Sequence, residues 1–101
     1  MTRQAVGPDD LAPGELRAVD VGGRRICLAK VDQTVYAVSD TCTHEEVSLS
    51  EGEIWDGSVQ CPQHGSLFDL ATGEVTGMPA QIPVETFSVQ VEDGTIFVDA
   101  G

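Results

Sequence analysis

The chain has 101 residues, which fits a single domain, and 41% of them are apolar, as in ordinary folded globular proteins. Seventeen acidic residues against five basic ones give a formal charge of −12, which excludes nucleic acid and anionic membrane surfaces as partners. The longest uninterrupted apolar runs, such as Ile26–Ala29, are far shorter than the roughly 18 residues that a membrane-spanning helix needs.

The charges are unevenly distributed along the sequence. All five basic residues lie within residues 1–30, whereas residues 31–101 contain thirteen acidic residues and no Lys or Arg. This pattern predicts an acidic surface suited to a basic protein partner or to solubility alone. The sequence starts without an apolar signal segment, so we expect a cytoplasmic protein.

Alternating apolar residues predict strands in the first third of the chain. Residues 6–15, with Pro8, Pro13 and Gly14, are interpreted as an irregular loop after a first edge strand. Leu16, Val19 and Val21 precede Gly22-Gly23, a dipeptide typical of tight hairpins. After it, one set of positions, Ile26, Leu28 and Lys30, alternates with a second set, Cys27, Ala29 and Val31. Thr34–Ser39 continues the alternation and predicts a third strand of this group.

Two Asp-Gly dipeptides predict two further hairpins. Asp56-Gly57 separates Ile54-Trp55 from Ser58–Gln60, and Asp93-Gly94 separates an alternating segment from Thr95–Val98. Apolar positions nowhere keep a helical spacing over a dozen residues. We therefore predict an all-β domain of eight to ten short strands.

The central third of the chain differs from its flanks. Between residues 40 and 80 the predicted strands are shorter and turn residues are more frequent. We interpret 1–101 as one domain, in which a small subdomain at about 40–80 is inserted into a β-framework formed by 1–39 and 81–101. Loops on a rigid scaffold often carry functional sites, so we expect the site in the inserted part.

Two cysteines lie close to the two histidines of the chain. They form the segments Cys42-Thr43-His44 and Cys61-Pro62-Gln63-His64, with sixteen residues between His44 and Cys61. Three cysteines cannot all pair as disulfides, and the grouping of thiols with imidazoles favours a metal site held by two loops. A tetrahedral zinc site, in a zinc-stabilised interaction module, uses the same ligand types and remains an alternative.

The same two segments, followed by Gly65, resemble the motif of the Rieske [2Fe–2S] proteins. The resemblance implies the Rieske fold, an antiparallel β-sandwich framework with a small cluster-binding subdomain. It also implies one [2Fe–2S] cluster per chain, with Cys42 and Cys61 on one iron and His44 and His64 on the other. The size of the chain is similar to that of free-standing Rieske ferredoxins of bacterial ring-hydroxylating oxygenase systems.

This resemblance implies a one-electron carrier that is not itself an enzyme. It would take electrons from an NAD(P)H-dependent flavoprotein ferredoxin reductase and pass them to a terminal oxygenase, meeting both transiently as a monomer. The small subunit of an assimilatory nitrite reductase shares the fold and is the other functional alternative, although many such subunits lack the four ligands.

Departures from the high-potential members of the family predict a low midpoint potential. Those members join the two loops by a disulfide, whereas this sequence has Val47 and Gln63 at the two positions. They also place a serine and a tyrosine near the cluster sulfurs, and here Ser66 is kept but Phe68 replaces the tyrosine. Acidic residues near the loops act in the same direction, namely Glu45, Glu46, Asp69 and Glu74.

The remaining residues of interest have simpler interpretations. We expect Cys27, which lies in a strand pattern, to be buried and inert. Trp55 is expected to pack in the core of the subdomain, and Gly65 to allow close approach of the backbone to the cluster. Gly77–Ala80 resembles the proline-containing loop that covers the cluster in this family.

Overall fold

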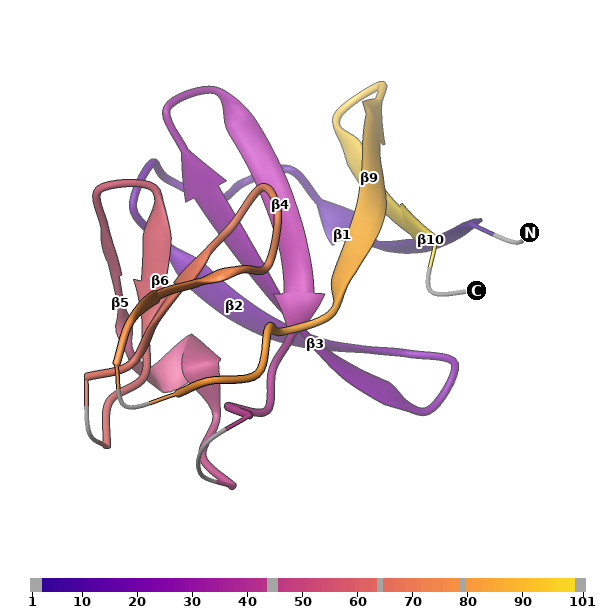
Figure 1. Cartoon of the computed structure of the whole chain (residues 1–101). Helices are drawn as coiled ribbons and strands as arrows, with labels where there is room; N and C mark the ends of the chain where they lie inside the picture. Colours follow the sequence, from indigo (N-terminus) through magenta and orange to yellow (C-terminus); the bar gives the residue numbers. More distant parts are fainter. Residues whose placement is uncertain (1–2, 44–45, 64, 79, 100–101) are drawn as a thin grey trace.

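The computed structural model describes residues 3–43, 46–63, 65–78 and 80–99. In these ranges the chain forms ten strands in two antiparallel sheets and one turn of 3-10 helix (Figure 1). The all-β prediction is therefore confirmed. The six-stranded sheet has the order β1-β10-β9-β4-β3-β2, and the four-stranded sheet has the order β5-β6-β7-β8.

The strands of the large sheet come from both ends of the chain. Their bounds are β1 (Arg3–Pro8), β2 (Leu16–Val21), β3 (Arg24–Val31), β4 (Thr34–Ser39), β9 (Thr86–Glu92) and β10 (Thr95–Asp99). The small sheet is built from the sequence between β4 and β9. Its elements are the 3-10 turn η1 (Leu49–Glu51), β5 (Glu53–Trp55), β6 (Ser58–Gln60), β7 (Leu67–Asp69) and β8 (Val75–Gly77).

The predicted hairpins are confirmed by their turn conformations. Gly22-Gly23 joins β2 to β3, Asp56-Gly57 joins β5 to β6, and Asp93-Gly94 joins β9 to β10. All six turn residues have positive φ angles, between 50° and 84°. Two-residue hairpin loops of this mirror-image type need positive φ at both central positions, which Gly and Asp tolerate better than most residues.

Strand β3 is buried on both faces because it separates two hydrophobic cores. Ile26 and Leu28 point into a framework core with residues of β2, β4 and β10. The alternating residues Cys27 and Ala29 belong to a second core, which includes buried residues of the small sheet. This double burial explains why Ile26–Ala29 is a continuous apolar run rather than an alternating one.

The first strand is longer than the sequence predicts. β1 extends to Pro8 and pairs with β10, with a shift of register between Ala5 and Gly7. The prediction of a loop over 6–15 is therefore wrong for residues 6–8. Gly7 interrupts the local strand pattern, but its φ of 144° fits the bulge that this shift of register creates.

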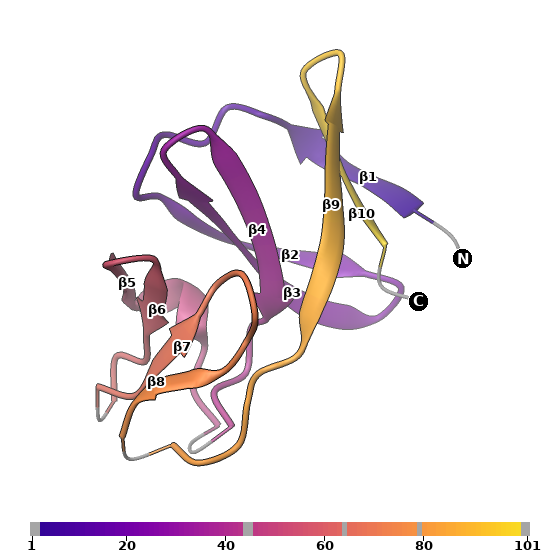
Figure 2. The same cartoon turned by 45° about the horizontal axis from the view of Figure 1, so that its top comes forward.

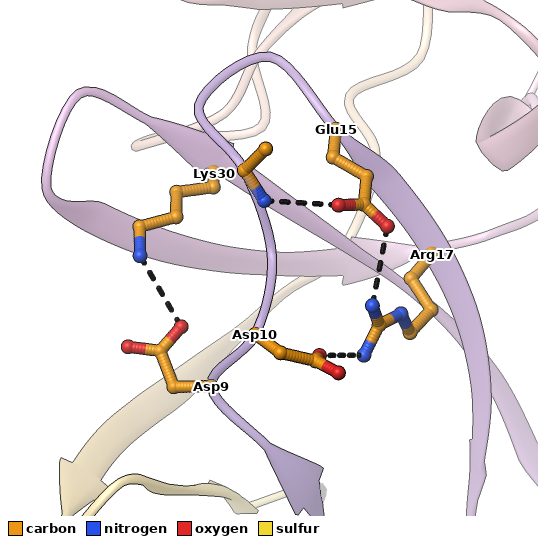
Figure 3. Close-up of polar contacts among 6 residues, drawn as sticks. Asp9, Asp10, Glu15, Arg17 and Lys30 are labelled. Carbon is orange, nitrogen blue, oxygen red and sulfur yellow. Dashed lines mark hydrogen bonds and ion pairs between the residues drawn. The ribbon is translucent and has the colours of Figure 1, made fainter.

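Ionic contacts fix the loop between β1 and β2 (Figure 3). The Arg17 guanidinium contacts Asp10 at 2.6 Å and Glu15 at 3.1 Å, and Lys30 Nζ lies 3.3 Å from Asp9 Oδ1. The hydrogen bond from Arg17 lowers the pKa of Asp10. The pKa of Glu15 is lowered mainly by the hydrogen bond from the Ala12 N–H and, to a smaller extent, by the hydrogen bond from Arg17. The loop thus anchors the edge of the framework without using any residue of the small sheet.

Candidate metal centre

The two cysteines of the predicted ligand set lie in one core at the edge of the small sheet. Cys42 is 3% exposed and Cys61 is 1% exposed, and both thiols are free of disulfides. They belong to the same cluster of buried residues as Phe68 and Leu49. A metal cofactor held here would be shielded from water on the side of these sulfur atoms.

The first cysteine lies in a loop that is closed by backbone pairing. Thr41 and Ser48 form an isolated antiparallel bridge, and the Cys42 N–H donates to the Val47 carbonyl at 3.0 Å. One step further out, the Leu49 N–H donates to the Asp40 carbonyl at 2.6 Å. The two ends of this loop are therefore held together from residue 40 to residue 49.

The second cysteine lies at the start of the connection between β6 and β7. The Cys61 N–H donates to the Ser66 carbonyl at 2.8 Å, and the Gly65 N–H donates back to the Cys61 carbonyl at 3.1 Å. Gly65 has a φ of 80°, a conformation that strains other residues. The structure thus gives a backbone reason for this glycine, separate from the close approach that the sequence predicts.

A third segment, residues 80–82, is hydrogen-bonded to both loops. The Thr43 hydroxyl donates to the Ile82 carbonyl at 2.6 Å, and the Ala80 N–H donates to the Ser66 hydroxyl at 3.0 Å. Figures 1 and 2 show the connections before η1, after β6 and after β8 at the same end of the small sheet. The predicted covering loop Gly77–Ala80 is adjacent to this contact, although its Pro79 is outside the described residues.

The two predicted imidazole ligands, His44 and His64, are also outside the described residues, as is Glu45. Within the ranges that the structure describes, no group of three or more His, Cys, Asp or Glu residues is placed to hold a metal ion. What the structure supplies is a pair of buried thiols, Cys42 and Cys61, in two loops that are tied together. This donor pair fits half of the ligand set of an iron–sulfur cluster with mixed ligands.

The acidic residues are not all placed as the sequence predicts. Asp69 pairs with Ser58 next to the Asp56-Gly57 turn, at the end of the strands remote from Cys61. Its carboxylate accepts the N–H groups of Ala71 and Thr72, so it shapes the turn that leads to Glu74. The expectation that Asp69 and Glu74 lie beside the ligand loops is therefore wrong. Asp69 precedes the turn and Glu74 follows it. Strand β7 runs away from the Cys61 loop, so it carries both residues away from that loop.

Sequence reasoning missed two acidic residues that do lie beside a ligand loop. An open depression next to Cys61 is lined by Glu51, Gly52, Glu53, Gln60, Pro62 and Gly65. Glu53 pairs with Gln60, the residue before Cys61, across the β5–β6 ladder. The position of Glu53 follows from the Asp56-Gly57 hairpin register, which was the available signal.

Trp55 does not pack in the core of the small sheet. Its side chain is 68% exposed, so the prediction is wrong. Neighbouring residues of a strand point to opposite faces, and the preceding Ile54 packs against the core. Trp55 therefore points outward, immediately before the turn.

The third cysteine is placed as the sequence predicts. Cys27 is fully buried in the core that also contains Cys42 and Cys61. Burial, with a smaller contribution from the charge of Asp40, raises the pKa of the Cys27 thiol to about 12. A thiol with this pKa stays protonated near neutral pH and is a poor nucleophile.

Comparison with known proteins identifies the class to which this fold and this donor pair belong. A family model described as "Rieske [2Fe-2S] domain" matches residues 3–88. The match covers both loops and most of the framework. The fold and the site therefore define a Rieske protein, and the cofactor is the Rieske [2Fe–2S] cluster.

Individual relatives narrow this assignment. Ferredoxin CarAc of Metapseudomonas resinovorans is 38% identical over 90 residues, which cover 88% of this chain and 84% of that protein. The ferredoxin of carbazole 1,9a-dioxygenase from Nocardioides aromaticivorans IC177 superposes with a TM-score of 0.91 at 34% identity, covering 97% of both chains. A chain in the complex of reduced oxygenase and oxidized ferredoxin in carbazole 1,9a-dioxygenase superposes with a TM-score of 0.90 at 36% identity, covering 95% of this chain and 100% of that one. The present chain belongs to the Rieske [2Fe–2S] family, among the ferredoxins of bacterial aromatic ring-hydroxylating dioxygenase systems.

Proposed function

We propose that a flavoprotein reductase supplies this chain with electrons one at a time and that a terminal oxygenase receives them. The chain is a ferredoxin component of a dioxygenase system that transfers electrons to the oxygenase, and it is not itself catalytic. The observation that carries the proposal is the convergence of two buried thiols in hydrogen-bonded loops at one end of a Rieske fold. A flavin releases two electrons and a [2Fe–2S] centre holds one, so two encounters are needed for each hydride equivalent.

In this proposal four residues hold the cluster. Cys42 and Cys61 bind one iron, and His44 and His64 bind the other. The bound cluster supplies a site that accepts and releases one electron, with the electron favouring the iron bound by neutral imidazoles over the one bound by thiolates. The burial of Cys42 and Cys61 supports the first pair of ligands. The assignment of His44 and His64 rests on their place in the motif.

The surface next to the loops is suited to brief contact with a partner. Ile82, in the segment that is bonded to both loops, is 63% exposed, and Met78, just before that segment, is 83% exposed. Around them the small subdomain, residues 40–80, contains eight acidic residues and no basic one. We infer that basic docking surfaces on both partners are attracted to this end and that the complexes are weak and short-lived.

The remaining parts of the proposal concern the state of the protein in the cell. We propose a monomer that acts in the cytoplasm. The described part of the chain has no helix that is long and apolar enough to cross a membrane.

The proposed site should have a midpoint potential in the lower part of the Rieske range, which spans roughly −150 to +300 mV. Val47 and Gln63 cannot form the disulfide of high-potential members, and the buried Phe68 has no hydroxyl to donate to a cluster sulfur. Protein-film voltammetry measures the midpoint directly. A value near +300 mV would contradict this account of the site.

The decisive test of the proposed function is the content of the anaerobically purified protein. We expect two irons and two inorganic sulfides per chain, and an EPR signal of Rieske type after reduction. His44→Ala and His64→Ala should each abolish that signal, whereas the control Cys27→Ser should keep it because Cys27 is not a ligand. A colourless protein that holds one zinc ion would refute the proposal.

A further inference from the structure

The two ligand loops are held at their bases in different ways. The loop after Cys61 closes through backbone bonds of Cys61 with Gly65 and Ser66, between two paired strands in which Gln60 is opposite Leu67. The loop around Cys42 is not flanked by two paired strands, and its backbone pairing is limited to the isolated bridge between Thr41 and Ser48 and the hydrogen bonds on either side of it. Its base depends in addition on a side chain, that of Asp40.

Asp40 is a buried residue that contacts two other parts of the chain. Its carbonyl accepts the Leu49 N–H at 2.6 Å, and its Oδ1 accepts the Ser50 N–H at 2.8 Å. Its Oδ2 accepts a hydrogen bond from Arg25 Nε at 3.2 Å, on the framework strand β3. One residue therefore joins the start of the Cys42 loop to its end and joins both to the framework.

The partner of Asp40 is one of two adjacent arginines with contrasting environments. Arg24 pairs with Glu85 at 2.9 Å, and both side chains are more than half exposed. Arg25 is 58% exposed, but the Asp40 side chain that it contacts is only 1% exposed. The Asp40 carboxylate is shielded from water at that depth, and Arg25 and the Ser50 N–H are the groups that contact it.

We propose that Asp40 is a positioning residue for the cluster and that the Arg25–Asp40 pair sets its midpoint potential. The proposal rests on the proposed ligation by Cys42, which is two residues from Asp40. Asp40 fixes the loop from which Cys42 approaches the cluster. Arg25 neutralises a buried negative charge that would otherwise oppose the arrival of an electron.

This arrangement predicts opposite effects from the two halves of the pair. Arg25→Gln leaves the buried carboxylate without its cation and lowers the midpoint, because reduction adds a further negative charge nearby. Asp40→Asn removes the carboxylate charge and raises the midpoint, while its amide oxygen can still accept the Ser50 N–H. The double variant should return toward the wild-type value.

Arg24→Gln is the matched control. It removes the same charge from the adjacent residue of the same strand, but its partner Glu85 is exposed and is screened by water. The readout is the equilibrium constant for reduction against a redox dye of known potential, measured on protein with full iron and sulfide content. We expect Arg25→Gln to lower this constant on the order of tenfold and Arg24→Gln to change it by less than about twofold.

A second measurement tests positioning independently of potential. The rate of iron loss to a chelator should rise in Asp40→Asn and stay at the wild-type value in Arg24→Gln. If Asp40→Asn does not retain the cluster at all, the positioning role is supported and the two arginine variants decide the potential.

Equal midpoints for Arg24→Gln and Arg25→Gln would overturn the proposed effect on potential. A fully loaded Asp40→Asn protein with unchanged midpoint and unchanged iron loss would overturn the whole proposal. Either result leaves the proposed electron carrier intact, because that function fails only if the wild-type protein lacks iron and sulfide.

Discussion

The framework and the small subdomain differ in net charge and in how far their charges are paired. The framework, residues 1–39 and 81–101, has nine acidic and five basic residues and a net charge of −4. Each of its five cations contacts a carboxylate at 3.3 Å or less. The small subdomain, residues 40–80, has eight acidic residues, no cation and a net charge of −8. Its buried Asp40 is neutralised by Arg25, which belongs to the framework.

The two regions also differ in how they are stabilised. The framework core is formed by its own strands and by Leu11 in the loop after β1. The small subdomain shares its core with one face of β3 and places Cys42 and Cys61 within it. A region with short strands and unbalanced charge can remain folded if a metal cluster crosslinks its loops. The framework therefore provides stability, while the acidic subdomain presents a negative electrostatic potential to partners.

Loss of the cluster should produce the largest difference in stability between the two regions. In Cys61→Ser protein, which lacks a thiolate ligand, we expect amides of the small sheet to exchange about 100-fold faster, a loss of about 3 kcal/mol in opening free energy. Amides of β3 and β10 should keep their protection because the framework core contains no ligand. Hydrogen exchange followed by mass spectrometry gives both values in one experiment, and uniform deprotection would contradict an independent framework.

Matched core substitutions test the same division. Phe68 and Ile96 are 0% and 1% exposed, one in each core. Phe68→Ala should cost about 3–5 kcal/mol and Ile96→Ala about 2–5 kcal/mol in unfolding free energy. Both costs are measurable by urea denaturation. Only Phe68→Ala should also reduce the iron content, and equal iron loss in both variants would show that the cores are not separate.

Cys27 offers a smaller test at the boundary between the cores. Its pKa of about 12 in the folded protein lies above the ordinary thiol value of 9.0, so its protonated form stabilises the fold. This contribution is complete below pH 9 and is lost as pH rises toward 12, by about 1.4 kcal/mol per pH unit. Cys27→Ala should remove this slope from urea unfolding measured between pH 9 and 11. An unchanged slope would place the alkaline transition in other groups.

The smallest expected effect concerns partner steering. Glu46 in the Cys42 loop and Asp93 in the β9–β10 turn are both exposed acidic residues, one in each region. Glu46→Gln should slow electron transfer from the reductase about twofold at low ionic strength, and the difference should vanish near 0.5 M salt. Asp93→Asn is the control, because Asn also accepts the positive φ of this turn. Rates that are independent of salt would refute steering.

Local patterns predicted much of the fold from the sequence. The turns at Gly22-Gly23, Asp56-Gly57 and Asp93-Gly94 follow from residues that are adjacent in the chain, and the strands on either side follow from their alternation. The motif also indicated Cys42 and Cys61, which the structure places in one core, whereas the complete ligand set with His44 and His64 stays a prediction.

The failures come from information that is not local. Trp55 is as apolar as a core residue, and only the orientation of Ile54 decides that it points outward. Asp69 looks close to the ligand loop in sequence, but strand β7 carries it to the other end of the sheet. The importance of Asp40 depends on Arg25, fifteen residues earlier, and one buried carboxylate cannot be told from its exposed neighbours by sequence alone.

The two-faced burial of β3 has a consequence for folding. Because side chains alternate, a slip of β3 by one residue would exchange the sets that face the two cores and turn Arg25 toward the interior. Such a misaligned chain would lack both the wall behind Cys42 and the partner of Asp40. Correct alignment of the framework is thus a precondition for the walls and contacts on which the Cys42 loop depends.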